Sequence, residues 1–282
     1  MKALLKSIIP PILLSAYRRL RYGRPPLPEW EYLPNGWPES RSDAGTGWEH
    51  ESVAVAQRRK WPQFQRMIQA PAPFSVSHES PEPDPNCVGS QNAILGFAYA
   101  IARTPRNDNR LSMLDVGCGA GHYRSLLQQL FPEIRFDYTG FDLPHLCALG
   151  RELHPGATFV DREEAYLGKK FDFVLVSGSL QYSRDWKGTL RNLRRCTAGS
   201  LFVTRLPVAL ASPAYVIRQR AHAYGYETEY AGWVLNRNEL LRSAEEVGLE
   251  LVREFLLMDR ILVAGAPEPV GHRGFLFRPA PR

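Results

Sequence analysis

The segment LDVGCGAGHY, residues 114–123, constrains the fold of this chain more than any other feature. Three glycines at alternate positions follow a short apolar run. Glycine gives up the most backbone freedom on folding, so three in one turn indicate a backbone that other residues rarely adopt, or a group that approaches it closely. The spacing is GxGxG, and His122 stands where the dinucleotide-binding fingerprint GxGxxG has its third glycine.

Strand-like and helix-like segments alternate around this turn. Apolar segments typical of strands lie at 111–116, 136–142, 157–160, 171–176 and 200–206, and helical patterns follow His122 and cover 145–153 and 185–196. This alternation predicts a doubly wound α/β fold, with a mostly parallel, seven-stranded sheet covered on both faces. A capped helix is predicted from Asn236 to Gly248, then a strand at 249–257 and a last strand at either 260–264 or 272–278.

The chain before residue 88 has a different character. Residues 25–50 are rich in Pro, Gly and Trp and predict an irregular, aromatic extension. Two short helices are predicted at 51–60 and 62–69, separated at Pro62, before a proline-rich connector at 71–86. We therefore divide the chain into a segment 1–24, an extension 25–87 and a main domain 88–282.

The positive charge is concentrated in one short segment. The whole chain has 35 Lys and Arg against 29 Asp and Glu, and residues 1–24 hold six of the basic residues and no acid. The rest of the chain is therefore neutral overall, which argues against a nucleic-acid partner. The four cysteines are scattered with no metal-ligand spacing, which indicates a reducing compartment such as the cytoplasm and predicts no metal site.

Residues 1–24 are too short and too interrupted to span a bilayer. From Pro11 onward, apolar residues share one face of a potential helix and arginines lie mostly off it. Two interpretations stay open. The segment rests on an anionic membrane surface, which would place the protein at the inner face of the cell membrane, or it docks on the protein's own body.

Acidic residues stand near the carboxyl ends of the first three strands of the predicted sheet. Asp115 stands two residues before the first glycine of the turn, Asp142 ends the second strand and Asp161 follows the third. A carboxylate at the turn repels a pyrophosphate and favours a cation. Aspartate is also common where strands end, because it suits turns. Asp142 and Asp161 can therefore also be explained as turn residues.

With this pattern the sequence resembles the class I S-adenosylmethionine-dependent methyltransferases, over about residues 90–265. The resemblance implies a Rossmann-like fold and S-adenosylmethionine as cofactor, with Asp115 near its amino group, Asp142 on its ribose hydroxyls and Asp161 near its adenine. The other residues that it implies at the cofactor are Gly117, Cys118, Gly119, Gly121, Leu143, Ser177, Gly178 and Ser179.

A narrower likeness rests on three short segments, WEYLPNGW (30–37), SLQYSRDW (179–186) and FVTRLPV (202–208). With them the chain resembles methyltransferases associated with bacterial surface-polysaccharide biosynthesis. This likeness implies O-methylation of a sugar or glycan intermediate. Methylation of another small molecule or a lipid, and a subunit that binds the cofactor without catalysis, stay open as alternatives.

Methylation of a hydroxyl requires a base, and histidine is the commonest choice. His122 follows the glycine turn directly, and His222 and Tyr224 lie in the long segment 207–236, so these three residues are the candidates. That segment holds several tyrosines, Trp233, Arg218 and Arg220, which suit a sugar bearing phosphate. We expect it to form a lid over the acceptor; a dimer contact or a simple cover is the alternative. The oligomeric state stays open.

Overall fold

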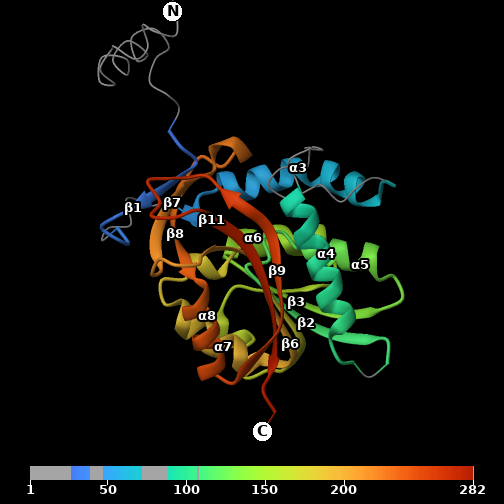
Figure 1. Cartoon of the computed structure of the whole chain (residues 1–282). Helices are drawn as coiled ribbons and strands as arrows, with labels where there is room; N and C mark the ends of the chain where they lie inside the picture. Colours follow the sequence, from blue (N-terminus) through green and yellow to red (C-terminus); the bar gives the residue numbers. More distant parts are fainter. Residues whose placement is uncertain (1–26, 39–46, 72–87, 107, 282) are drawn as a thin grey trace, which may run out of the picture.

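The computed structural model describes residues 27–38, 47–71, 88–106 and 108–281 (Figure 1). The predictions for residues 1–24 and for the connector at 71–86 therefore lie, apart from Pro71, outside the described residues. No helix in the described ranges has both the length and the apolar character needed to cross a membrane.

The main sheet has seven strands in the order β4-β3-β2-β5-β6-β11-β9. Its first five strands are parallel, and β11 pairs antiparallel with both β6 and β9. The strands are β2 (Arg110–Val116), β3 (Arg135–Phe141), β4 (Thr158–Val160), β5 (Phe171–Ser177), β6 (Thr197–Ala209), β9 (Leu249–Ile261) and β11 (Val270–Pro279). The predicted fold class is confirmed, and of the two alternatives for the last strand, 272–278 lies in the main sheet.

Helices cover both faces of this sheet (Figure 1). One face packs against α4, α5 and α6, with α3 lying on α5 and α6, and the other face packs against α7 and α8. The helices are α3 (Ser52–Gln69), α4 (Val88–Arg103), α5 (His122–Leu130), α6 (Pro144–Leu153), α7 (Trp186–Cys196) and α8 (Arg237–Glu246). Asn236 caps α8 as predicted, because its side chain accepts a hydrogen bond from the Glu239 amide at 2.9 Å.

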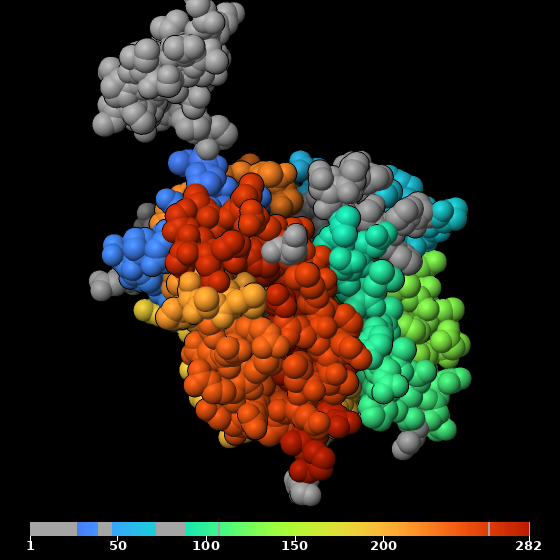
Figure 2. All heavy atoms as spheres, viewed as in Figure 1, coloured from blue at the N-terminus to red at the C-terminus, as the bar shows by residue number. Residues whose placement is uncertain are grey.

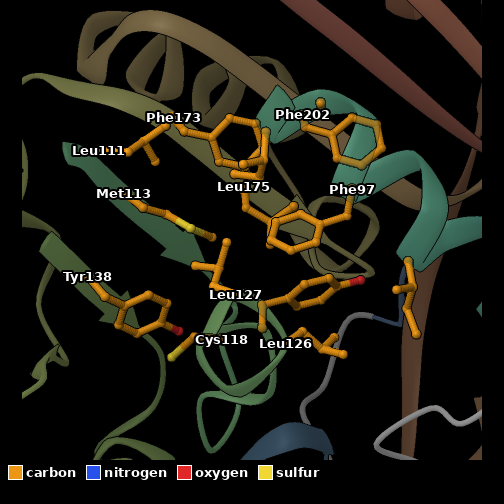
Figure 3. Close-up of a cluster of buried hydrophobic side chains, with 14 of the residues drawn as sticks. Phe97, Leu111, Met113, Cys118, Leu126, Leu127, Tyr138, Phe173, Leu175 and Phe202 are labelled. Atoms are coloured by element: carbon orange, nitrogen blue, oxygen red, sulfur yellow. The ribbon is translucent and has the colours of Figure 1, made fainter. Parts of the chain in front are cut away.

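Alternate side chains along each strand point to opposite faces of the sheet. Figure 3 shows Phe97 of α4 and Leu127 of α5 beside Met113 of β2 and Leu175 of β5, all fully buried. Each such side chain contributes about 1.5–3 kcal/mol by leaving water. In Figure 2 α4 lies beside β9, where the rings of Tyr99 and Phe255 are 5.5 Å apart.

A second, mostly antiparallel sheet continues from the end of β6, where β8 pairs with β6 in parallel. Its strands are β1 (Trp30–Leu33), β7 (Tyr215–Arg220), β8 (Glu229–Asn236) and β10 (Val263–Ala264). The segment 207–236 is therefore mostly a β-hairpin, with the short helix η4 (Ala221–Tyr224) between its strands. The other short helices are η1 (Gly47–Glu49), η2 (Glu163–Ala165) and η3 (Leu180–Tyr182).

Two predictions for the extension were wrong. Residues 30–33, expected to be irregular, form β1, because β7 supplies an antiparallel partner and β10 a parallel one. The helix break at Pro62 is absent, and α3 runs through it. Val53, Trp61 and Phe64 are buried along one face of α3, and this packing outweighs the hydrogen bond that proline cannot donate.

Candidate active site

A cavity of about 950 Å³ opens at the carboxyl ends of β2, β3 and β5. This is the edge at which doubly wound sheets bind ligands. Its wall is formed by the glycine turn, the residues after β3, β4 and β5, described residues 37–57 of the extension, and the second sheet. The volume lies in the range of cavities that hold a small-molecule ligand.

The three glycines of the turn have an unusual backbone conformation and close neighbours, the two reasons for glycine that their spacing suggested. Gly117, Gly119 and Gly121 have φ values of +79°, +55° and +87°, which residues with a side chain rarely adopt. A Cβ at Gly117 would lie 2.3 Å from the Ser179 Cβ, and one at Gly121 would lie 2.8 Å from the His154 ring. The turn is therefore left-handed at three points and closely covered by neighbouring residues.

Every backbone N–H of residues 117–121 already has an acceptor within the protein. Gly117 and Cys118 donate to the Phe141 carbonyl at 2.8 and 3.2 Å, and the remaining three also bond internally. Phosphate sites of glycine-rich loops depend on such amides pointing freely at the anion. The turn therefore has no free amide with which to bind a pyrophosphate.

Asp142 holds the turn from the end of β3. Its Oδ2 accepts a hydrogen bond from the Gly119 amide at 2.7 Å, and its Oδ1 accepts one from the Leu143 amide at 2.7 Å. Each carboxylate oxygen keeps a further lone pair, and Asp142 lines the cavity. Burial raises the pKa of Asp142 to about 6, against the opposing effect of the two amide hydrogen bonds.

Asp115 lies behind the turn, not at its mouth. Its side chain is 0% exposed and its Oδ2 accepts a hydrogen bond from the Tyr138 hydroxyl at 2.8 Å. Its Oδ1 has no hydrogen-bond partner among the described residues. Burial raises the pKa of Asp115 to about 7, and the nearby Asp142 charge adds to this effect. Asp115 is not among the residues that line the cavity, so its carboxylate influences a ligand there through its charge.

Of the other residues that the sequence proposed for the cofactor, all but Gly121 line the cavity. Leu143, Asp161, Ser177, Gly178 and Ser179 all line the cavity, together with Cys118 of the turn. Their side chains have protein partners as well. Ser179 donates to the Val116 carbonyl at 2.6 Å, Ser177 lies 2.8 Å from the Tyr123 hydroxyl, and Asp161 lies 3.7 Å from Arg151.

The three candidate bases lie in different places. His122 borders the cavity but is only 4% exposed, because its ring packs edge-on against Trp61 and Phe64 at 4.9 and 5.0 Å. His222 and Tyr224 lie in η4 and are not among the lining residues. His222 faces the Tyr226 carbonyl at 3.1 Å. Of the three, His122 alone is therefore positioned beside the cavity.

Sequence reasoning included Tyr230 among the tyrosines of the predicted lid, but it missed Trp48 and Tyr182, which lie beside Tyr230 in the cavity wall. Trp48 stacks on Tyr230 with ring centroids 4.4 Å apart and an interplanar angle of 19°, and Tyr182 packs edge-on against both. We call Trp48, Tyr182 and Tyr230 the aromatic wall. They come from η1, η3 and β8, and no local sequence signal connects segments that are so far apart.

Gln57 of α3 is a second residue that sequence reasoning missed. It is 3% exposed and borders the cavity, and its Oε1 accepts the Ala120 amide of the turn at 3.0 Å. A Cβ on Gly119 would lie 3.1 Å from the same oxygen. The extension before residue 88 therefore supports the turn directly.

Comparison with known proteins identifies the class of this chain. Residues 94–254, more than half of the chain, match a family described as a methyltransferase domain. This chain belongs to that family. It is an S-adenosylmethionine-dependent methyltransferase.

The chain is also similar to individual proteins. It is 34% identical over 90 residues to a malonyl-[acyl-carrier protein] O-methyltransferase of Acetivibrio thermocellus, which is 30% of this chain and 31% of that protein. Among solved structures it is similar to S-adenosylmethionine-dependent methyltransferases from Methanosarcina mazei and Clostridium acetobutylicum. The first has a TM-score of 0.48 and 14% identity, covering 64% of this chain and 97% of the other. The second has a TM-score of 0.48 and 10% identity, covering 79% of this chain and 99% of the other.

The residues of the cavity fit this cofactor. S-adenosylmethionine carries no phosphate, in agreement with a turn that has no amide to offer one. Its sulfonium and ammonium groups are positive, in agreement with the two carboxylates around the turn. Asp142 lines the cavity, and each of its carboxylate oxygens can accept a further hydrogen bond from a hydroxyl donor. The aromatic wall and residues of the second sheet border the same cavity.

Replacing Gln57 with leucine will leave the Ala120 amide buried without an acceptor. We expect a loss of about 1–3 kcal/mol in the free energy of unfolding, measured by urea denaturation. Calorimetry will show weaker binding of S-adenosylhomocysteine, because the turn is no longer fixed from α3. Leucine at Gln65, a residue of the same helix that bonds Ser125 away from the turn, is the control. Equal cofactor affinity in both variants would contradict the role assigned to Gln57.

Because the pKa values of Asp115 and Asp142 are raised, we expect the preference for the positively charged cofactor to depend on pH. The pKa values of Asp115 and Asp142 are raised to about 7 and about 6, so both side chains lose charge as the pH falls from 8 to 5. The ionised forms attract the sulfonium, which S-adenosylhomocysteine lacks. The affinity ratio of S-adenosylmethionine to S-adenosylhomocysteine should therefore fall about three- to tenfold over this range. Calorimetry at several pH values measures the ratio, and a constant ratio would contradict the electrostatic account.

Proposed function

We propose that this methyltransferase O-methylates a sugar or glycan intermediate of cell-surface polysaccharide assembly. The observation that carries the proposal is the aromatic wall of Trp48, Tyr182 and Tyr230, which borders the same cavity as the glycine turn. Aromatic faces are suited to the apolar face of a sugar ring, and the polar groups around them suit its hydroxyls. The three short segments that resemble polysaccharide methyltransferases point in the same direction.

When bound, the cofactor supplies a methyl group already activated by the sulfonium. The chain's own task is then to align the acceptor and exclude water, which contributes most of the acceleration in such transfers. In this proposal the glycine turn and Asp142 hold the donor, and the aromatic wall orients the acceptor ring. His122 is the proposed base for an acceptor hydroxyl, because it is the one of the three predicted candidates that borders the cavity.

The proposal also concerns location. We place the enzyme in the cytoplasm, with the basic residues 1–24 at the inner face of the cell membrane, next to glycan assembly. Removal of residues 1–24 should then shift the protein from the membrane fraction to the soluble fraction without changing its affinity for S-adenosylhomocysteine. An unchanged distribution between the fractions would contradict this placement.

A transfer assay tests the acceptor. The full chain is incubated with tritiated S-adenosylmethionine and with membrane and soluble glycan fractions of the source cells, and label in isolated sugars is counted. We expect labelled sugar, and none with an Asp142→Ala variant. Label confined to lipids or to non-sugar metabolites would contradict the glycan proposal. Cofactor binding without any transfer would favour a non-catalytic subunit.

A further inference from the structure

Tyr182 is the member of the aromatic wall that the chain fixes from several sides. Its ring lies edge-on to Trp48 at 5.2 Å and to Tyr230 at 5.1 Å, and it borders the active-site cavity. It belongs to η3, which follows the segment 177–179 that the sequence proposed for the cofactor. Tyr182 therefore lies between that segment and the second sheet.

Gln219 of β7 holds the phenol of Tyr182 from outside the cavity. The Tyr182 hydroxyl donates a hydrogen bond to the Gln219 Oε1 at 2.9 Å. Gln219 is 7% exposed and is not among the residues that line the cavity. In the ladder of β7 and β8 it stands directly opposite Tyr230, and side chains in opposite positions are close neighbours on one face. Gln219 is therefore adjacent to two of the three residues of the aromatic wall.

Glu29 determines which end of the Gln219 amide faces Tyr182. The Gln219 Nε2 donates to the Glu29 Oε1 at 3.2 Å. A carboxylate oxygen only accepts hydrogen bonds, so the amide nitrogen faces Glu29 and the amide oxygen faces Tyr182. Glu29 is held in turn, because its carbonyl accepts the Arg220 amide at 2.8 Å. The chain just before β1 thus fixes the direction of the hydrogen bond that reaches Tyr182.

Gly232 of β8 provides the space that the ring of Tyr182 needs. A Cβ at Gly232 would lie 3.2 Å from two carbons of this ring, which is closer than ordinary van der Waals contact. Gly232 is not among the glycines with a positive φ, so its backbone conformation does not require glycine. The close approach of the ring does. We call Gln219 and Gly232 the tyrosine seat.

The residues proposed for the cofactor are fixed independently of the tyrosine seat. The Gly178 amide donates to the Thr204 carbonyl at 2.9 Å, and the Ser179 hydroxyl donates to the Val116 carbonyl at 2.6 Å. A change in the tyrosine seat should therefore displace the ring of Tyr182 without displacing the segment after β5.

We propose that Gln219 is a positioning residue for the acceptor: it holds the phenol of Tyr182 beside Gly232 and so fixes the ring surface that meets the acceptor. Gln219 acts through Tyr182, because it does not itself line the cavity. This inference rests on the proposed use of the aromatic wall to orient the acceptor. It does not require that the acceptor is a sugar.

Transfer kinetics of the full chain test the proposal. Saturating tritiated S-adenosylmethionine and increasing amounts of the soluble or membrane fraction of the source cells give an apparent KM and a limiting rate, with label counted in every product. Gln219→Leu removes the amide and Tyr182→Phe removes the hydroxyl. Each should raise the apparent KM about three- to tenfold and change the limiting rate by less than about twofold. Calorimetry should show unchanged S-adenosylhomocysteine affinity in both variants.

Further variants separate positioning from a general loss of structure. If Gln219 acts through the Tyr182 hydroxyl, the double variant should have the same apparent KM as either single variant, not the product of the two effects. Gly232→Ala keeps both hydrogen-bonding groups and crowds the ring, so it should raise the KM as well. Gln65→Leu is the matched control and should keep the wild-type KM, because Gln65 bonds Ser125 away from the wall.

A spectroscopic measurement reports on the aromatic wall without any acceptor. In protein labelled with 5-fluorotryptophan, the fluorine resonance of Trp48 is assigned by its loss in Trp48→Phe. Gln219→Leu should shift or broaden this resonance, because Tyr182 packs edge-on against Trp48 and its ring would move. The resonance of Trp61, which packs against His122, should keep its position.

An unchanged KM in both Gln219→Leu and Tyr182→Phe would overturn the proposal. Multiplied effects in the double variant, or a Trp48 resonance that does not change in Gln219→Leu, would overturn it as well. The glycan proposal fails differently, since it is judged by which product the wild type labels, whereas the role of Gln219 is judged by how the variants change the KM for that product. No labelled product from the wild type with either fraction would overturn both.

Discussion

Alanine at Asp142 will weaken the binding of S-adenosylmethionine by about 100-fold or more. The variant loses a carboxylate that accepts hydrogen bonds from the Gly119 and Leu143 amides and lines the cavity. Hydrogen bonds to a charged group contribute about 1.5–3 kcal/mol each, and two to the ribose would account for an effect of this size. Calorimetry with both S-adenosylmethionine and S-adenosylhomocysteine measures the loss.

The control for this variant lies on β3, the strand that directly precedes Asp142. Asp137 is exposed in β3 and is not part of the cavity wall, so Asp137→Ala should bind both ligands as the wild type does. Asp142→Asn keeps the size of the side chain but not its charge, and should fall between the wild type and the alanine variant. If Asp142→Ala retains wild-type affinity while remaining folded, Asp142 does not hold the ribose.

Alanine at Gly117 will both destabilise the protein and abolish cofactor binding. The added Cβ would lie 2.3 Å from the Ser179 Cβ, and the φ of +79° is strained for any residue with a side chain. The backbone strain alone costs about 1–2 kcal/mol. The clash adds to it, and we expect a total loss of about 3 kcal/mol or more in the free energy of unfolding. Urea denaturation measures this loss.

Gly156 offers a matched control, because it has a φ of +85° and a Cβ added there would have nothing within 4 Å. Gly156→Ala therefore carries the backbone strain without the clash and should lose about 1 kcal/mol only, with cofactor affinity unchanged. Adding Ser179→Gly to Gly117→Ala removes the clashing atom and should restore part of the stability. Equal losses in the two alanine variants would show that Ser179 does not press on the turn.

The elements that the sequence predicted well depend on local patterns. Nearly continuous apolar runs such as 171–176 occur in buried parallel strands, and Asn236 with Glu239 marks a helix start within four residues. The spacing of Asp115, the glycines and Asp142 is similarly local to one strand–turn–helix–strand unit. For this reason the sheet could be predicted from the amino-acid sequence, and nine of the eleven residues that the sequence proposed for the cofactor line the cavity.

The features that sequence reasoning missed depend on distant partners. Strand β1 forms only because β7, nearly 200 residues later in the chain, pairs with it. Gln57 reaches Ala120 across 63 residues, and Trp48 meets Tyr230 across a still longer interval. In each of these contacts the two partners are too far apart in the sequence for a local pattern to predict that they meet.

The packing of α3 explains why the extension belongs with the main domain. Trp61 and Phe64 close over His122, and Gln57 bonds the turn that follows β2. A helix outside the residues that match the methyltransferase family thus completes the wall of the cofactor site. Residues of the extension therefore belong to the same packed unit as the main domain.

A crystal structure of the full chain with S-adenosylhomocysteine tests the central claim most directly. The account predicts the adenosyl group against the turn at 117–121, with the Asp142 carboxylate within hydrogen-bond distance of both ribose hydroxyls. An adenosyl group bound elsewhere in the cavity, with Asp142 contacting only the Gly119 and Leu143 amides, would contradict it.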